Sequence, residues 1–359
     1  MRKHYIDNLR WFFIILLVPY HAVQAFNAWG EPNYIFITPN ILLSSFIVFF
    51  SPFMMPLLFL LAGMSTKFAL NKRSYKEYIV ERAKRLLIPL VFGTLVFMPV
   101  MCYLADKYNC GYQGSFFSHY RIFFTRITDL MGADGGFSIG QFWFLLYLFV
   151  ISLLALGIIA IQKKCVKKHI ELPLGVIVLL GLPLPLINDL LSIGGKGLVV
   201  FLYFFMLGYY VFSNDKIIEK IAKWKYLFLV IGLIADIADI YLFLWSKTPY
   251  PTLNDAMKYI TEWCMILALL GLGKDKFDTH NKVTDHLSRI SFLFFSLHFL
   301  VVVVTQYLTA TMLKTNTAVL FILQVSISFV CTFLLCEICV RVPALCFLLG
   351  VKPKKKTEK

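Results

Sequence analysis

The ionisable residues of the first apolar segment have types and a spacing that could support chemistry. Arg10 and His21 are eleven positions apart, so a helix places them within about 20° of each other around its axis. Asp7 lies three residues before Arg10 and shares that side of the helix. The helical rise puts His21 roughly 16 Å beyond Arg10, near the middle of a ~30 Å hydrocarbon layer. An imidazole at that depth usually faces a polar cavity, where it can act as a proton acceptor.

Three further ionisable residues occur at a similar depth in other apolar segments, namely Asp236, Glu262 and His298. Each lies about 13–18 Å along its own helix from the basic residues at the inner end of that helix. Their convergence predicts an acid–base site in which Glu262 and His298 assist His21 as catalytic groups. One alternative is that these groups form hydrogen bonds that only fasten the helices together. A separate alternative for Asp236 and Asp239 is that the two carboxylates form a proton or cation relay.

A pair of arginines stands at the inner end of the third apolar segment. Arg82 and Arg85 are three residues apart and are therefore neighbours on one helical face. Guanidinium groups make bidentate contacts to phosphate, so the pair could hold an anionic nucleotide at the cytoplasmic surface. The alternative is that both are ordinary basic residues flanking a membrane span. Together with His21, a phosphate-binding arginine pair at the inner end of a span suggests that the ligand is acyl-coenzyme A (acyl-CoA), with its thioester at His21. The imidazole could then activate an acceptor hydroxyl or take the acyl group itself.

The segments that must position these residues are numerous and apolar. The 359 residues are 59% hydrophobic and 15% charged, with a mean hydropathy of +0.74, which is typical of a polytopic membrane protein. We therefore expect an all-α integral membrane protein with about ten transmembrane helices. The expected spans are 9–28, 41–62, 86–104, 141–162, 173–190, 197–213, 226–245, 256–273, 290–311 and 318–340.

The net charge of +15 carries information about topology. Lys and Arg are concentrated in alternate segments between the apolar runs, as the positive-inside rule describes, and an even number of spans then keeps the N- and C-termini cytoplasmic. This pattern argues against a nucleic-acid partner. The eight Cys residues lack zinc-site spacing with nearby His, so the sequence predicts no metal site. We assign residues 1–345 to one membrane domain and 346–359 to a basic cytoplasmic tail that could contact membrane lipids.

Five short motifs in chain order resemble the membrane acyltransferase 3 family, which includes bacterial O-acetyltransferases of peptidoglycan and O-antigen. They are Arg10 to His21 with Asp7, Pro56 to Met64, Arg82 to Pro89, Phe142 to Leu145, and Leu293 to His298. The resemblance implies that His21 is the catalytic imidazole and that Arg10, Arg82 and Arg85 contact the acyl donor, and we group Asp7 with them. The sequence departs from the family at Ala62, where a Ser usually precedes Gly63. The segment from Glu337 to Pro353 resembles the glucan biosynthesis protein C branch, whose members are succinyltransferases acting on periplasmic glucans.

These observations predict a multi-pass enzyme of the plasma membrane that carries out O-acylation. It would move an acetyl or succinyl group from cytoplasmic acyl-CoA, as co-substrate, to a hydroxyl of a cell-envelope glycan or lipid-linked saccharide. No bound cofactor is expected. The alternative is a secondary transporter or exporter of an envelope precursor that uses Asp236, Asp239 and Glu262 as a relay. That alternative accounts for the spans and the buried charges but does not account for the ordered motifs.

Overall fold

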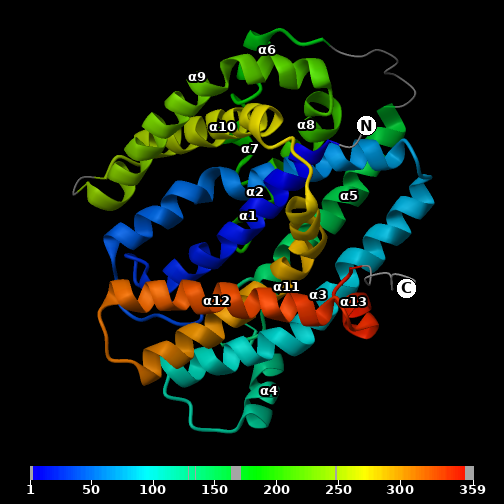
Figure 1. The fold of residues 1–359 in the computed structure, drawn as a ribbon. Helices are drawn as coiled ribbons and strands as arrows, with labels where there is room; N and C mark the ends of the chain where they lie inside the picture. The colour runs from blue at the N-terminus through cyan, green and yellow to red at the C-terminus, as the bar shows by residue number, and fades with distance from the viewer. Residues whose placement is uncertain (1–2, 128, 134, 163–170, 247–248, 352–359) are drawn as a thin grey trace. The chain divides into compact units, whose positions relative to one another are not determined.

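The computed structural model describes residues 3–351 apart from 128, 134, 163–170 and 247–248 (Figure 1). Most of the predicted basic tail, residues 352–359, therefore lies outside the described residues. Within the described part of the chain, the named strands are one antiparallel pair, β1 (Ser192–Ile193) and β2 (Lys196–Gly197). The other elements are helices.

Eight helices among the described residues are long and apolar enough to cross a membrane, and each overlaps a predicted span. They are α1 (His4–Val23) with η1 (Gln24–Phe26), α2 (Ile41–Leu70), α3 (Tyr75–Asn109), η2 (Gly140–Phe142) with α5 (Trp143–Gln162), α9 (Asp215–Ile240) with η4 (Tyr241–Trp245), α10 (Pro251–Lys276), α11 (Lys282–Met312) and α12 (Thr317–Cys339). This architecture confirms the expectation of an all-α polytopic membrane protein. The cytoplasmic placement of the termini stays a prediction.

The two remaining predicted spans, 173–190 and 197–213, form shorter apolar helices. The first is divided into α6 (Leu174–Leu179) and α7 (Leu184–Ile187), and the second into α8 (Leu198–Leu207) and η3 (Gly208–Phe212). Pro183 and Pro185 explain the break, because proline cannot donate the backbone hydrogen bond that would continue a helix through this segment. The ten predicted spans therefore correspond to eight long helices and two short apolar segments.

Side-chain caps fix the starts of several helices. Ser74 and Glu77 form a capping box before α3, in which Glu77 Oε2 accepts from the Ser74 N–H at 2.8 Å and the Ser74 hydroxyl at 2.9 Å. Ser115 caps the short helix α4 (Phe116–Thr125), and Asn316 caps α12. The last helix, α13 (Pro343–Leu348), begins with a proline and includes the predicted start of the tail at residue 346.

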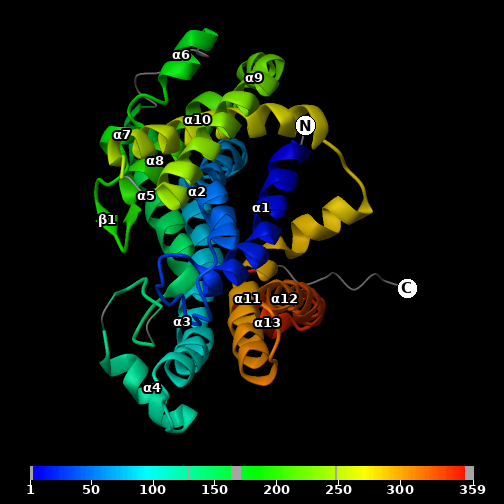
Figure 2. The same ribbon diagram turned by 90° about the vertical axis from the view of Figure 1, so that its left-hand side faces the viewer.

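The chain divides into two compact units. Unit 1 is built from the described residues of Met1–Phe13, Val48–Val80 and Val150–Asp285, and unit 2 from those of Ile14–Ile47, Glu81–Phe149 and His286–Lys359. In unit 1, α9 and α10 lie side by side along their length (Figure 2). In unit 2, α13 packs against α12, from which it follows directly in the chain.

Two glycines allow close packing within unit 1. A Cβ on Gly63 in α2 would lie 1.9 Å from the carbonyl oxygen of Phe205 in α8, and a Cβ on Gly208 in η3 would lie 2.0 Å from the carbonyl oxygen of Leu60. Because backbone faces backbone at both places, no flexible side chain can move aside. Small residues of this kind let membrane helices approach closely.

Replacing Gly63 by Ala should therefore destabilise the protein. The new methyl group must push α2 and α8 apart, at a cost of about 1–3 kcal/mol for overpacking. We expect a melting temperature in detergent several degrees below that of the wild type. Gly157→Ala in α5 is the matched control, because a Cβ there meets nothing within 4 Å. Equal melting temperatures for Gly63→Ala and Gly157→Ala would show that the close approach of α2 and α8 is not required.

Candidate functional site

The last turn of α1 places His21 beside a second imidazole within unit 2. The ring centre of half-buried His21 lies 5.3 Å from that of His298 on α11, and the His21 ring stacks on Phe299 at 3.9 Å. Gln306 Nε2 donates to the backbone oxygens of His21 and Ala22 at 3.1 and 3.2 Å. Carbonyls in a last helical turn lack partners inside their own helix, which is why a side chain from α11 can bind them. The structure thus brings together two of the predicted catalytic residues.

Hydrogen bonds to the backbone define the protonation pattern of His298. Its ring is buried, and Nδ1 lies 2.8 Å from the Phe295 oxygen and 3.1 Å from the Phe294 oxygen. Because a carbonyl oxygen only accepts, Nδ1 must carry the proton and Nε2 keeps its lone pair. Among the described residues, Nε2 has no hydrogen-bond partner. His298 therefore presents a ring nitrogen with a lone pair that can accept a hydrogen bond.

The first turns of α1 hold Asp7 and Arg10 within unit 1. Arg10 Nη1 lies 3.0 Å from Asp7 Oδ1, and Arg10 Nη2 donates to the Ser65 hydroxyl at 2.7 Å. The Ser65 hydroxyl in turn donates to the Leu61 carbonyl oxygen at 2.8 Å, which leaves its lone pairs to accept from Arg10. Asp7 and Ser65 thus orient the guanidinium group from both sides. Sequence reasoning missed Ser65, although a hydroxyl one turn after Ala62 in an apolar helix was an available signal.

A pocket of about 730 Å³ lies beside these residues in unit 1. It is lined by Lys3, Ile6, Asp7, Ser65, Phe68, Ala69, Asn71, Lys72 and Arg73. Its three basic residues outnumber its one carboxylate, and Ile6 and Phe68 add apolar surface. Lys3 is bound to Asp215 at 2.7 Å, whereas Lys72 and Arg73 are exposed. The excess of positive charge suits an anionic ligand such as a phosphate.

The two predicted arginines of α3 belong to unit 2. Arg82 is half-buried and Arg85 is exposed. The guanidinium carbon of Arg85 lies 5.3 Å from the ring centre of Phe292, which is a cation–π contact. The predicted donor-binding residues are therefore divided, with Asp7 and Arg10 in contact in unit 1 and Arg82 and Arg85 in unit 2.

The predicted carboxylates of the later spans lie on the α9–α10 pair in unit 1. Glu262 and Asp236 are both buried, and neither oxygen of Asp236 has a hydrogen-bond partner among the described residues. Asp239 accepts a hydrogen bond from Asn254. The unit that contains them is not the one that contains His21 and His298, so a shared acid–base site with Glu262 stays a prediction. Buried ionisable groups within a membrane span are usually functional, so Asp236 and Glu262 remain candidates for a functional role.

A buried ionic cluster that sequence reasoning missed connects α3 with α4 in unit 2. Asp106 Oδ2 lies 2.8 Å from His119 Nε2, and Arg126 Nη2 lies 2.9 and 2.8 Å from the two carboxylate oxygens of Asp106. His119 is 0% and Asp106 is 4% exposed. The sequence separations of these residues follow no helical period, so spacing alone could not reveal the cluster. Its position at the end of α3 indicates that it fastens the segment containing α4.

Replacing Asp106 by Asn should loosen this segment. The change removes the charged partner of both His119 and Arg126, and the loss of charge-assisted hydrogen bonds costs about 1.5–3 kcal/mol each. We expect a lower melting temperature in detergent and faster proteolysis within residues 105–140. Asp129→Asn, at an exposed carboxylate of the same segment, is the control. Indistinguishable stability and proteolysis in the two variants would exclude this role for Asp106.

Comparison with known proteins adds one finding to this geometry. The model of a family described as an acyltransferase domain matches residues 3–341, which include every helix from α1 to α12. No curated protein and no solved structure gives a significant match. The matched range contains His21 and His298 of unit 2 and the residues that line the basic pocket of unit 1.

Proposed function

We propose, from the premise that this chain belongs to the acyltransferase 3 family and is a multi-pass membrane acyltransferase, that it modifies the cell envelope. It transfers an acetyl or succinyl group from acyl-CoA to a hydroxyl of a glycan or lipid-linked saccharide at the plasma membrane. The observation that carries this proposal is the basic pocket of unit 1 beside Asp7, because its basic side chains offer an anionic donor a place to bind.

The pocket fits the head of acyl-CoA in size and chemistry. Its volume of about 730 Å³ is typical of small-molecule sites. Lys72 and Arg73 supply N–H donors for phosphate oxygens, and Phe68 supplies apolar surface for the nucleotide base. Lys3 is the third basic residue of the lining, and Arg10 contacts two other lining residues, Asp7 and Ser65. Arg82 and Arg85 are assigned to the donor as well, on the resemblance of their motif to that of the family.

In the proposed transfer step, His21 is the proton acceptor. The acceptor hydroxyl gives its proton to the imidazole as its oxygen attacks the thioester carbonyl, the C–S bond breaks, and the coenzyme A thiolate is then protonated. In the alternative sequence, His21 attacks the thioester first and passes the acyl group to the hydroxyl. Both sequences need a neutral imidazole, and the Nε2 lone pair of His298 in the same unit can accept a hydrogen bond that orients the reacting groups.

One observation favours a second candidate function. The Asp236 carboxylate is buried and has no hydrogen-bond partner within the described part of the chain, as a proton-coupled exporter of an envelope precursor would require. In that case Asp236→Asn should abolish transport, whereas an acyltransferase that uses His21 should retain thioester turnover in this variant.

The proposed function is tested by incubating purified protein in detergent with acetyl-CoA or succinyl-CoA and measuring the release of free thiol. The account predicts slow hydrolysis of one thioester, accelerated by a suitable saccharide, and thermal stabilisation by the same donor. A folded protein that neither binds nor cleaves either thioester would contradict the account and favour the exporter.

His21→Ala should abolish turnover while leaving donor binding intact. Removing a general base or nucleophile typically lowers the rate by about 10²–10⁴-fold. Thiol release and the donor-induced thermal shift are measured on the same preparation, so loss of catalysis is separated from loss of folding. His286→Ala, which removes another half-buried imidazole of unit 2, is the matched control. Turnover by His21→Ala at the wild-type rate would remove His21 from the mechanism.

Substitutions in the basic residues should act on donor affinity. We expect Lys72→Ala, Arg73→Ala, Arg82→Ala and Arg85→Ala each to raise the KM for acyl-CoA by about tenfold with a smaller effect on kcat, because each would remove a charge-assisted contact to phosphate. Lys84→Ala serves as the control, since Lys84 is exposed on α3 between the two arginines. An unchanged KM in the Lys72 and Arg73 variants would show that the donor does not use this pocket.

A further inference from the structure

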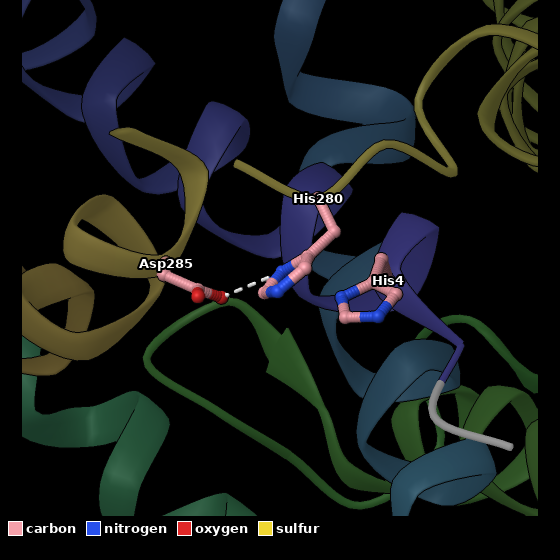
Figure 3. A group of neighbouring side chains, drawn as sticks. All are labelled: His4, His280 and Asp285. Carbon is pink, nitrogen blue, oxygen red and sulfur yellow. Dashed lines mark ion pairs between the residues drawn. The ribbon is translucent and has the colours of Figure 1, made fainter. Parts of the chain in front are cut away.

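Three potential metal ligands from distant parts of the sequence meet at the start of α1 within unit 1 (Figure 3). His4 is the first residue of α1, His280 lies in the connection between α10 and α11, and Asp285 is in the first turn of α11. One ligand atom from each residue lies within 4.8 Å of the other two. In the part of the chain that the structure describes, this is the one group of three His, Cys, Asp or Glu that meets this criterion.

The three side chains face one another. His280 Nδ1 lies 3.0 Å from Asp285 Oδ1, and the ring centres of His4 and His280 are 4.5 Å apart. Figure 3 shows the His280 ring between the Asp285 carboxylate and the His4 ring. An ion pair between His280 and Asp285 would account for two of these residues but not for the approach of His4. A single cation bound by all three accounts for the whole arrangement.

The donor set selects the class of cation. Zinc binds His nitrogen and Asp oxygen at about 2.0–2.2 Å in tetrahedral geometry, which places two of its ligand atoms roughly 3.3 Å apart. The 3.0 Å separation of His280 Nδ1 and Asp285 Oδ1 is already close to that value. His280 and Asp285 are exposed, so small side-chain rotations can bring the third ligand in. Calcium and magnesium prefer all-oxygen sites and are disfavoured by two imidazoles.

The backbone around this cluster is held in place independently of any cation. Asn8 Nδ2 donates to the Phe277 and Thr279 carbonyl oxygens at 2.6 and 2.9 Å, and the Tyr5 N–H donates to Asp278 Oδ1 at 3.1 Å. These bonds fix the connection after α10 on the first two turns of α1. The fold itself therefore presents His280 to His4, and such preorganisation reduces the cost of binding.

We propose that His4, His280 and Asp285 bind one divalent transition-metal ion of the zinc type, with water in the fourth position. The ion connects the first residue of α1 to the connection between α10 and α11 and to the start of α11. Because the first turns of α1 also provide Ile6 and Asp7 to the basic pocket, an occupied site stabilises one wall of that pocket. The site goes beyond the proposed acyl transfer, to which none of these three residues is assigned.

The test uses untagged, metal-free protein in detergent, titrated with Zn²⁺ by calorimetry and by thermal shift. We expect one zinc ion per chain and a rise in melting temperature with zinc concentration. Protein loaded with Co²⁺ should lose the absorption of the bound cobalt when Zn²⁺ is added, because zinc displaces it. His4→Gln, His280→Gln and Asp285→Asn should each weaken zinc binding at least about tenfold, because each removes a ligand.

Two variants separate loss of a ligand from loss of structure. Asp275→Asn removes an exposed carboxylate near the end of α10 that pairs with Lys225 and Lys276, and His286→Gln removes a nearby imidazole that contacts Glu337. Both should bind zinc with the affinity of the wild type. The proposal is overturned if the wild type binds no zinc, or if the three ligand variants bind it as tightly as these two controls.

Discussion

A polar group inside a hydrocarbon layer must find its partner within the protein, and this constraint organises the helices around the imidazoles. On α11, His298 directs one ring nitrogen to backbone oxygens of its own helix, and Gln306 binds the free carbonyls at the end of α1. One turn further, Gln324 of α12 donates to the Thr309 hydroxyl at 3.0 Å. These bonds leave few alternatives for the position of α11 within unit 2. Among the described residues His298 Nε2 has no hydrogen-bond partner, so this ring nitrogen can contact a substrate.

The helix α1 brings the two functional features of the chain into one element. Its first turns carry Asp7 and Arg10 beside the basic pocket, and its last turn carries His21. Arg10 is oriented by Asp7 and Ser65 before any ligand arrives, so little reorganisation is required on binding.

Local patterns in the sequence are sufficient to predict the long helices and the position of His21 along α1. Apolar runs of about twenty residues identify a span whatever its neighbours are, and the spacing of Arg10 and His21 is a property of one helix. The sequence also indicates that His298 and His21 lie at a similar depth, because the number of residues between each histidine and the basic end of its span gives its distance along the helix. Pro183 and Pro185 show the limit of hydropathy alone, since the segment is apolar enough but its backbone is interrupted.

Contacts between residues that are far apart in the sequence could not be predicted from it. The contacts of Asp106 with His119 and Arg126, and the meeting of His4 with His280, depend on how connections between helices fold back, and such approaches leave no periodic signal. The expectation that the chain lacks a metal site rested on Cys and His spacing, which detects only ligands that are local in sequence.

The central proposal is that the phosphates of acyl-CoA bind in the basic pocket of unit 1 that includes Asp7. The most direct test is a cryo-electron microscopy map of the His21→Ala variant with a saturating concentration of acetyl-CoA, since this variant should bind the donor without consuming it. The account predicts density for the nucleotide phosphates against Lys72 and Arg73. A nucleotide bound elsewhere on the protein, with this pocket empty, would contradict it.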